Sequence, residues 1–249
     1  MSPKSNLQSL IIIQARMRSS RLPGKILMEI DNQPSIIYQI NRITPILNKE
    51  TKLIIATTKN SPDDDLCDLL ETQDIEFHRG SEVDVLGRFI ECMKKYPSNE
   101  VIRLNADCPL ICPEVIEKTI LTLRENNECD YSSTILDETY PLGMHVEAMT
   151  YSTLIKCDEL SHSQAEREHV TPYIYNNPEI FNLYPVRNMI DGSKHRITCD
   201  YEVDLKMIRY IANHFSGRNF TCNDIIHFLD DHPEISGINS HLMKSQTLS

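Results

Sequence analysis

A short basic loop directly after an apolar run constrains this chain more than any other segment. Residues 10–13 read Leu-Ile-Ile-Ile, which is typical of a strand buried on both faces. Residues 14–25, Gln-Ala-Arg-Met-Arg-Ser-Ser-Arg-Leu-Pro-Gly-Lys, then bring four cations, and no acidic residue appears before Glu29. The whole chain, in contrast, has a formal net charge of −11. This local excess of positive charge predicts a polyphosphate held at the carboxyl end of the first strand of an α/β sheet.

The overall composition narrows the class of protein. A chain of 249 residues is long enough to bury one large core. Its acidic balance argues against nucleic acid as a partner, because duplex binding needs a broad basic surface. The first apolar run ends at Gln14 and is too short for a signal sequence or a membrane span. We therefore expect a cytoplasmic protein with neither a nucleic-acid nor a membrane partner.

The eight cysteines are scattered along the chain. Without an export signal, they are expected to be reduced thiols in the core and not a disulfide framework. Cys108 and Cys112 lack a second Cys or His pair at zinc spacing, so they do not indicate a zinc site.

Strand and helix signals alternate through the first half of the chain. We expect strands at 7–13, 53–57, 75–77 and 101–104, and helices at 34–47, 61–70, 82–95 and 113–124, with Ser61 capping the second helix. This βαβα order predicts a mostly parallel sheet with helices on both faces.

After Cys129 the alternation loosens. We expect strands and a long loop over 131–149, a helix over 161–175 interrupted near Pro172, strands at 180–186 and 196–199, and helices at 202–215 and 221–229. The segment from His232 onward is polar, and we expect it to be frayed.

The basic loop combines hydroxyls, cations and a turn signal at Pro23-Gly24. Backbone N–H groups with Ser19 or Ser20 are suited to cradling phosphate oxygens, while Arg16 and Lys25 would neutralise them. The alternative is a solvated loop whose cations pair with acids elsewhere.

Two aspartates follow predicted strands. Asp107 lies in a turn closed by Pro109, where a carboxylate is suited to holding Mg²⁺ against an α-phosphate; a plain strand-to-helix turn is the alternative. Asp200 follows the predicted strand 196–199, and on spacing alone it reads as a helix N-cap. We expect Asp204 to face solvent in the first turn of that helix.

Several other polar residues admit two interpretations. The Arg79-Gly80-Ser81 segment follows a predicted strand and suits base or ribose contacts, although Ser81 could simply cap the next helix. Arg103 either contacts the base or pairs with an acid. His145 and Glu147 share one face of a predicted strand, and Glu168 and His169 belong to a polar helical cluster; a hydrated surface is the alternative for both groups.

These motifs together resemble the cytidylyltransferases that make CMP-activated sugars. The matching segments are residues 14–25, Arg-Gly-Ser at 79–81 with Asp-Val-Leu at 84–86, Arg-Leu-Asn-Ala-Asp-Cys-Pro-Leu at 103–110, Glu-His-Val-Thr-Pro-Tyr at 168–173, and 196–205. The sequence is most similar to the CMP-Kdo synthetase type and its spore-coat polysaccharide branch. One departure is Cys108, where CMP-Kdo synthetases usually carry Glu, which weakens the transfer of Kdo as the substrate.

The resemblance implies a three-layer, Rossmann-like α/β nucleotidyltransferase fold with a small β-rich insertion. Residues 1–230 would form one domain, with an acceptor-binding or dimerisation insertion at about 131–187 and a polar tail at 231–249. The implied reaction joins CMP from CTP to an acidic keto-sugar and releases pyrophosphate, for surface polysaccharide or glycan synthesis. The resemblance is compatible with a homodimer but does not decide the oligomeric state.

The resemblance also implies roles for individual residues. The implied catalytic residues are Arg16, Lys25 and Asp107, and the implied Mg²⁺ ligands are Asp107 and Asp200. The implied nucleotide-binding residues are Gln14, Ala15, Arg16, Ser19, Ser20, Lys25, Arg79, Gly80, Ser81, Asn105 and Ala106. The implied acceptor-binding residues are Arg21, His145, Glu147, Glu168 and His169.

Three alternative functions remain open on the sequence. The acceptor could be phosphorylated or a phosphonate, or the protein could keep the fold without turnover. A glycosyltransferase that consumes nucleotide-sugars is the third, but such enzymes usually carry Asp-x-Asp after a strand. No such motif follows residues 101–104, and Asp63-Asp64-Asp65 lies at a helix start instead.

Overall fold

A seven-stranded sheet forms the centre of the computed structural model, which describes residues 7–245. Its strands are β1 (Ser9–Gln14), β4 (Thr51–Thr58), β5 (Phe77–Gly80), β6 (Glu100–Asn105), β7 (Tyr131–Ser133), β8 (Glu147–Thr150) and β9 (Leu183–Pro185). They lie in the order β5-β4-β1-β6-β8-β7-β9, and β8 alone among them runs antiparallel to its neighbours. The expected mostly parallel sheet is confirmed.

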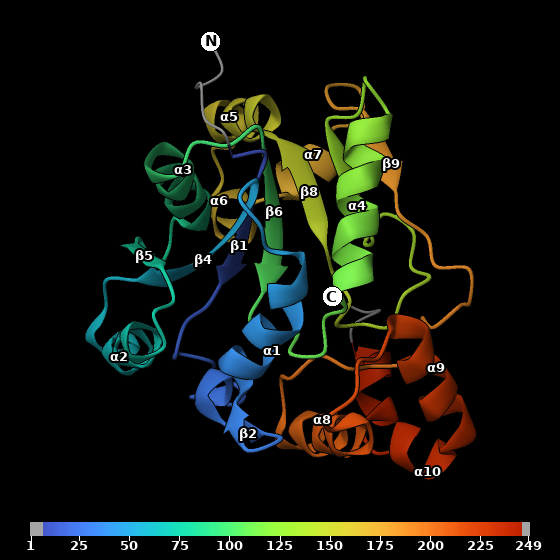
Figure 1. Ribbon diagram of the computed structural model, residues 1–249. Helices are drawn as coiled ribbons and strands as arrows, with labels where there is room; N and C mark the ends of the chain where they lie inside the picture. Colours follow the sequence, from blue (N-terminus) through green and yellow to red (C-terminus); the bar gives the residue numbers. More distant parts are fainter. Residues whose placement is uncertain (1–6, 246–249) are drawn as a thin grey trace.

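Helices cover both faces of this sheet (Figure 1). They are α1 (Ser35–Ile43), α2 (Asp64–Thr72), α3 (Val85–Lys95), α4 (Pro113–Glu125), α5 (Tyr151–Leu160), α6 (Gln164–His169), α7 (Pro172–Tyr175), α8 (Glu202–Phe215), α9 (Cys222–Asp231) and α10 (Pro233–Ser236). A short hairpin, β2 (Glu29–Ile30) with β3 (Gln33–Pro34), precedes α1.

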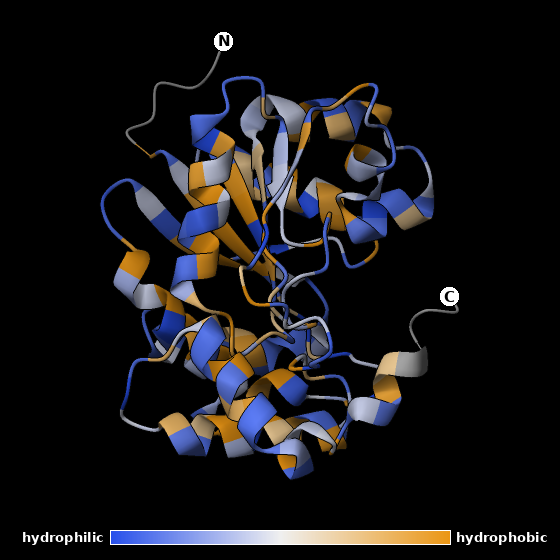
Figure 2. Ribbon diagram, turned by 90° about the vertical axis from the view of Figure 1, so that its right-hand side faces the viewer, coloured by the Kyte–Doolittle hydropathy of each residue, from blue (hydrophilic) through white to orange (hydrophobic). Residues whose placement is uncertain are grey.

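The apolar run that opens the chain belongs to two cores at once. Ile11 and Ile13 point into the core that contains α1 and α4, whereas Leu10 and Ile12 point into the core that contains α3 and α5. All four side chains are fully buried. Successive strand residues face opposite sides of a sheet, so a strand covered on both faces must be apolar at every position. Figure 2 shows these hydrophobic strands between helices with hydrophilic outer surfaces.

The last helices gather at the end of the molecule toward which β1 and β6 run (Figure 1). α8 has the bounds expected from the sequence, and Thr221 caps α9 by accepting a hydrogen bond from the N–H of Asp224. The expectation of a frayed tail is wrong for the described part, because α10 and the 3₁₀ helix Ser240–Ser245 continue the fold and Asn239 between them is fully buried.

Four element predictions need correction. β5 ends at Gly80, so Arg79 and Gly80 lie inside the strand and not after it. Residues 196–199 form no paired strand; Arg196 makes one isolated bridge with Leu142. β8 starts at Glu147, so His145 does not share a strand with it. The second predicted helix opens as a 3₁₀ turn, whose cap position is Asn60 and not Ser61.

The region 151–175 is more helical than expected. α5 was not predicted, because few of its residues are strongly apolar; only Thr153, Leu154 and Cys157 are buried. The interruption before α7 falls at Val170, whose φ of 73° is incompatible with a continuous helix.

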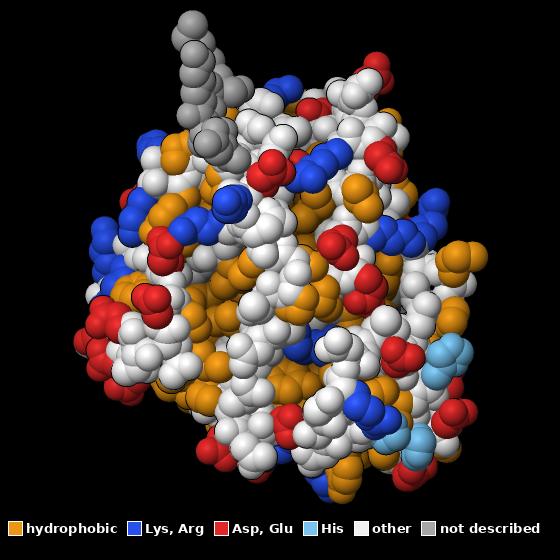
Figure 3. Space-filling model, in the orientation of Figure 1, with side chains coloured by type: hydrophobic (Ala, Val, Ile, Leu, Met, Phe, Trp, Pro, Cys, Tyr) orange, Lys and Arg blue, Asp and Glu red, His pale blue; other side chains and the backbone are white. Residues whose placement is uncertain are grey.

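All eight cysteines are buried free thiols, as expected. Within residues 7–245, no helix is long and apolar enough to cross a membrane. On the face drawn in Figure 3, acidic and basic side chains of the described residues are interspersed and form no broad basic area.

Candidate functional site

The basic loop leaves the end of β1 and returns to the core at Lys25. Gly24 donates its N–H to the carbonyl of Met17 at 3.0 Å and has a φ of 71°, a left-handed conformation that favours glycine. The predicted turn at Pro23-Gly24 is therefore confirmed. It brings Lys25, which is 9% exposed, beneath the loop.

A buried carboxylate fastens this loop to the neighbouring strand. Asp63 accepts a hydrogen bond from the N–H of Met17 at 2.6 Å, and its other oxygen accepts one from the hydroxyl of Thr58 at the end of β4. Because both oxygens of Asp63 are used, the loop is fixed relative to the sheet. Sequence reasoning placed Asp63 only at a helix start and missed this contact.

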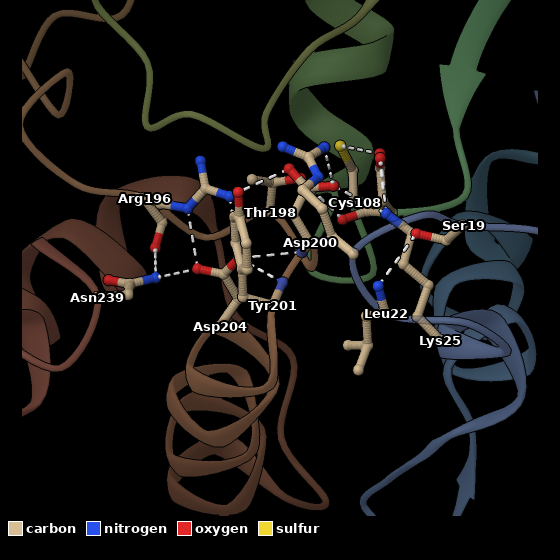
Figure 4. A network of polar contacts seen from close by, with 12 residues as sticks. Ser19, Leu22, Lys25, Cys108, Arg196, Thr198, Asp200, Tyr201, Asp204 and Asn239 are labelled. Carbon is tan, nitrogen blue, oxygen red and sulfur yellow. Dashed lines mark hydrogen bonds and ion pairs between the residues drawn. The ribbon is translucent and has the colours of Figure 1, made fainter. Parts of the chain in front are cut away.

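Lys25 lies between the two aspartates that were expected to hold a metal. Its Nζ is 3.1 Å from Oδ2 of Asp107 and 2.9 Å from Oδ1 of Asp200. Figure 4 shows Lys25 beside Asp200. Asp107 comes from the turn after β6, and Asp200 from the segment that leads into α8. The N-cap of α8 is Tyr201, so the helix-cap interpretation of Asp200 is wrong.

Asp200 is surrounded by cations. Arg21 approaches its Oδ1 at 2.8 Å and Arg196 its Oδ2 at 3.1 Å, in addition to Lys25. Burial alone would raise the pKa of Asp200, but Lys25, Arg21 and Arg196 outweigh it and lower the pKa. Burial opposes the charged form of Lys25, but the two carboxylates outweigh it and raise the pKa of Lys25. Both groups are charged at neutral pH.

Asp204 lies behind Asp200, and the expectation that it faces solvent is wrong. Asp204 is fully buried and forms a bidentate pair with Arg196, with N···O distances of 2.9 and 2.9 Å. It also accepts the backbone N–H groups of Asp200 and Tyr201, each at 3.0 Å. Asp204 thus fixes both the backbone of Asp200 and the arginine that contacts it.

These carboxylates open onto a cavity of about 300 Å³ that we call the loop cavity. It is lined by Gln14, Arg16, Arg18, Ser19, Ser20, Arg21, Lys25, Ile26, Arg103, Asn105, Ala106, Asp107, His169 and Asp200. Most of the predicted nucleotide residues, both predicted metal ligands and two predicted acceptor residues therefore meet here. Arg18 was counted in the basic run but given no role.

A smaller cavity of about 110 Å³ shares Gln14, Arg16 and His169 with the loop cavity and adds Ala15, Val85, Arg88 and Glu168. Arg88 is 3% exposed, and its Nε has no hydrogen-bond partner among the described residues. Burial lowers the pKa of this guanidinium. We call this space the Arg88 cavity; no sequence signal singled out Arg88.

The residues of segment 79–81, which were predicted to contact the nucleotide, make contacts with other residues of the chain. Arg79 pairs with Asp64 at 2.7 Å and donates to the carbonyl of Thr58 at 2.8 Å. Gly80 packs against the side chain of Arg88. The Ser81 hydroxyl accepts the N–H of Asp84, and Asp84 itself caps α3, so the Ser81 cap interpretation is wrong. None of the three lines the loop cavity or the Arg88 cavity.

Glu147 is also outside both cavities. It is 2% exposed, pairs with Arg103, and accepts hydrogen bonds from the hydroxyls of Tyr131 and Thr171. The expected contact of Glu147 with an acceptor stays a prediction, whereas Arg103 does pair with an acid. His145 lies near this pair, and burial lowers its pKa.

The donor set fits Mg²⁺ better than a metal that is held entirely by protein. Among residues 7–245 there is no cluster of three or more His, Cys, Asp or Glu side chains suited to a metal ion. Two carboxylate oxygens nevertheless converge on one cationic position, now filled by the Lys25 ammonium. Mg²⁺ typically uses one or two carboxylates and takes its other ligands from phosphate and water.

A cavity of about 500 Å³ lies between α1 and the α8–α9 connection, and none of the predicted site residues lines it. Its wall includes Arg42, whose guanidinium stacks over Phe220 at 3.6 Å and donates to the carbonyl of Ile111.

Comparison with known proteins agrees with this geometry. The family model described as cytidylyltransferase matches residues 10–213. An uncharacterized protein of Methanocaldococcus jannaschii is 35% identical over 93% of this chain and 94% of its own length. The spore coat polysaccharide biosynthesis protein SpsF of Bacillus subtilis is 28% identical over 90% of this chain and 95% of its own.

Among solved structures, a cytidylyltransferase from Leptospira borgpetersenii serovar Hardjo-bovis superposes with a TM-score of 0.87. It is 28% identical, and the match covers 92% of this chain and 97% of that one. The resemblance expected from the motifs and the Rossmann-like nucleotidyltransferase fold are thus confirmed. This chain belongs to the cytidylyltransferase family of nucleotidyl-transferring enzymes.

Proposed function

We propose that this enzyme transfers CMP from CTP to a hydroxyl of an acidic sugar and releases pyrophosphate. The observation that carries the proposal is the convergence of Asp107 and Asp200 on the Lys25 ammonium, at the floor of a cavity whose rim is the basic loop. One end of this cavity is suited to a triphosphate and the other to a divalent cation.

The basic loop would hold the triphosphate. Arg16 and Arg18 are exposed at its rim, and Ser19 and Ser20 line the same cavity. Because charge builds up on the leaving pyrophosphate, fixed cations and backbone N–H donors at this position stabilise the transition state. The contact between Asp63 and Met17 keeps the loop in place during that change.

Asp107 and Asp200 would hold Mg²⁺, which when bound offsets charge on the α-phosphate and lowers the pKa of the attacking hydroxyl. Lys25, displaced from the carboxylates, would pair with phosphate oxygens. A new bond forms between the sugar oxygen and the α-phosphorus, while the bond to the bridging oxygen breaks and pyrophosphate departs. The hydroxyl proton leaves to solvent or to a nearby carboxylate.

We place the cytosine ring in the Arg88 cavity. A guanidinium offers donors only, and N3 and O2 of cytosine are adjacent acceptors, whereas N3 of uracil is a donor. Arg88 lines this space, and its donor-only guanidinium therefore supports a cytidine nucleotide there.

Positive charge from Arg21 on the wall of the loop cavity supports an acidic acceptor. Arg21 is 44% exposed at its side chain, and His169 links the loop cavity to the Arg88 cavity. The name of the Bacillus subtilis relative, a spore coat polysaccharide biosynthesis protein, agrees with a sugar acceptor.

The test is pyrophosphate release across nucleotides and acceptors. We expect release from CTP with Mg²⁺ and an acidic keto-sugar, and neither from CTP alone nor from UTP or GTP. Release only with phosphorylated or phosphonate acceptors would replace the acidic sugar. Consumption of UDP- or GDP-sugars without pyrophosphate release from any acceptor would overturn the proposal.

A further inference from the structure

The Asp200 carboxylate is connected to a part of the chain far from the motifs. Asn239 lies between α10 and the last 3₁₀ helix, and it is fully buried. It also lies beyond residues 10–213, the segment that matches the family model. Figure 4 shows Asn239 at one end of the polar network whose centre is Asp200 and whose other end is the basic loop.

The side-chain amide of Asn239 has a single consistent orientation. Its Nδ2 donates to Oδ1 of Asp204 at 2.7 Å and to the carbonyl oxygen of Arg196 at 3.0 Å. Because both partners are acceptors, only the NH₂ group can face them. The Oδ1 of Asn239 has no hydrogen-bond partner among the described residues. An unpaired buried oxygen costs stability, which offsets part of what the two donated bonds contribute.

The contacts of Asn239 reach Asp200 in two steps. Nε and Nη2 of Arg196 each donate a hydrogen bond of 2.9 Å to Asp204. The same Nη2 also donates to Oδ2 of Asp200 at 3.1 Å. Arg196 thus bridges the two carboxylates, and Asn239 contacts both members of the Arg196–Asp204 pair. Fixing Oδ2 of Asp200 directs its other oxygen, Oδ1, toward Lys25.

We propose that Asn239 is a positioning residue for the metal-binding carboxylate of Asp200. It holds the Arg196–Asp204 pair in the one arrangement that directs Oδ1 of Asp200 into the loop cavity. The inference rests on the proposed function, because it takes Asp200 as a ligand of the divalent cation.

A second contact, independent of Asn239, also attaches the C-terminal segment. His195, 3% exposed, lies with Nε2 at 2.9 Å from Asp230 and Nδ1 at 3.0 Å from Ser236. This contact joins the same two parts of the chain, but it does not involve the side chains of Arg196, Asp204 or Asp200. Ser236 therefore offers a matched control for attachment without positioning.

The experiment compares Asn239→Leu with Ser236→Ala in the full chain. Leucine has a similar size but no donor, and it removes the unpaired oxygen as well. We expect Asn239→Leu to keep its thermal midpoint within a few degrees, while kcat and the affinity for divalent cation fall by about 10-fold or more, as for other residues that orient metal ligands. At saturating divalent cation the KM for CTP should change little, because the basic loop is untouched. Ser236→Ala should keep the wild-type kcat.

Cation affinity is measured directly, by calorimetric titration of Mn²⁺ into protein saturated with a non-hydrolysable CTP analogue. Unchanged kcat and unchanged Mn²⁺ affinity in Asn239→Leu would overturn the proposal, as would equal losses in Ser236→Ala. If leucine prevents folding, Asn239→Ala, which leaves room for water, is measured in the same way.

Measurements in the Asp200→Asn variant distinguish a failure of the role inferred for Asn239 from a failure of the proposed function. If Asn239 acts through Asp200, adding Asn239→Leu to Asp200→Asn causes no further loss of Mn²⁺ affinity. Wild-type Mn²⁺ affinity in Asp200→Asn alone would refute Asp200 as a ligand, and with it the metal site of the proposed function. Loss in Asp200→Asn with none in Asn239→Leu would refute only the role of Asn239.

Discussion

The Nζ atom of Lys25 lies 2.9 Å from Oδ1 of Asp200, although the two residues are 175 positions apart in the chain. The same ammonium lies 3.1 Å from Asp107. The one position where both carboxylates converge is therefore filled by a cation of the basic loop. A divalent cation at this position must displace Lys25, and the displaced ammonium is then free to pair with phosphate. In the proposed function, cation binding and nucleotide binding are therefore coupled through this one side chain.

Replacing Lys25 should separate the two binding events. Lys25→Met leaves two carboxylates without their shared ammonium, so we expect tighter Mn²⁺ binding in the absence of nucleotide. CTP binding should weaken, and the loss should shrink as salt rises because charge interactions are screened. Calorimetry with each ligand measures both effects, and Lys49→Met, at an exposed position, is the control. Weaker Mn²⁺ binding in Lys25→Met would contradict this coupling.

Substitutions of the two aspartates should differ in their effect on protein stability but not in their effect on turnover. We expect Asp107→Asn and Asp200→Asn each to lower kcat by at least about 100-fold, since a charged ligand is lost where phosphoryl charge develops. Only Asp200→Asn should lower the thermal midpoint, because among residues 7–245 Asp200 forms ion pairs with three cations and Asp107 with Lys25 alone. The control is Asp68→Asn, on the exposed side of α2, which should behave as wild type. A near-normal kcat in Asp107→Asn or Asp200→Asn would exclude that aspartate from the metal site.

Glu147 should matter for stability more than for direct acceptor contact. Glu147→Gln leaves the Arg103 guanidinium, 11% exposed, without its carboxylate. Breaking a buried ion pair by removing one partner costs about 3 kcal/mol in free energy of unfolding. Urea denaturation measures this loss. An unchanged free energy of unfolding, combined with a large rise in acceptor KM, would restore Glu147 as a substrate contact.

Stability should fall in mild acid because of His195. Burial lowers the pKa of His195 below 6.5, in spite of the nearby Asp230. The unfolded chain therefore binds this proton more readily than the folded chain, so the free energy of unfolding decreases as the pH falls below about 6.5. His195→Gln should flatten this dependence between pH 7 and pH 5. An equally steep decrease in the variant would assign it to other groups.

The cysteines should be unreactive in the native protein. Burial raises the pKa of Cys92, Cys199 and Cys222 to about 12. Because the thiolate is the reactive form, we expect no reaction with an aromatic disulfide reagent at pH 8 until the protein unfolds. Rapid labelling of any thiol under native conditions would contradict the burial of the cysteines.

Local patterns in the sequence determined the start of the fold and most of the site. The uninterrupted apolar run at 10–13 required a strand buried on both faces, and the Pro23-Gly24 turn followed from backbone preferences of two residues. Asp107 and the loop cations were identified because strand-to-loop junctions at the carboxyl edge of a parallel sheet necessarily meet.

Only the tertiary structure decided which polar residues face the cavity and which hold others in place. Glu147, Arg79 and Asp204 all have charges that suit either role. Their roles depend on partners 8 to 44 residues away and on burial by other elements. Asn239 shows this most clearly, because its partner Asp204 lies 35 positions earlier and no local pattern connects them. Burial and charge pairing are properties of the packed chain, since hydrogen-bond partners brought together by folding leave no periodic signal in sequence.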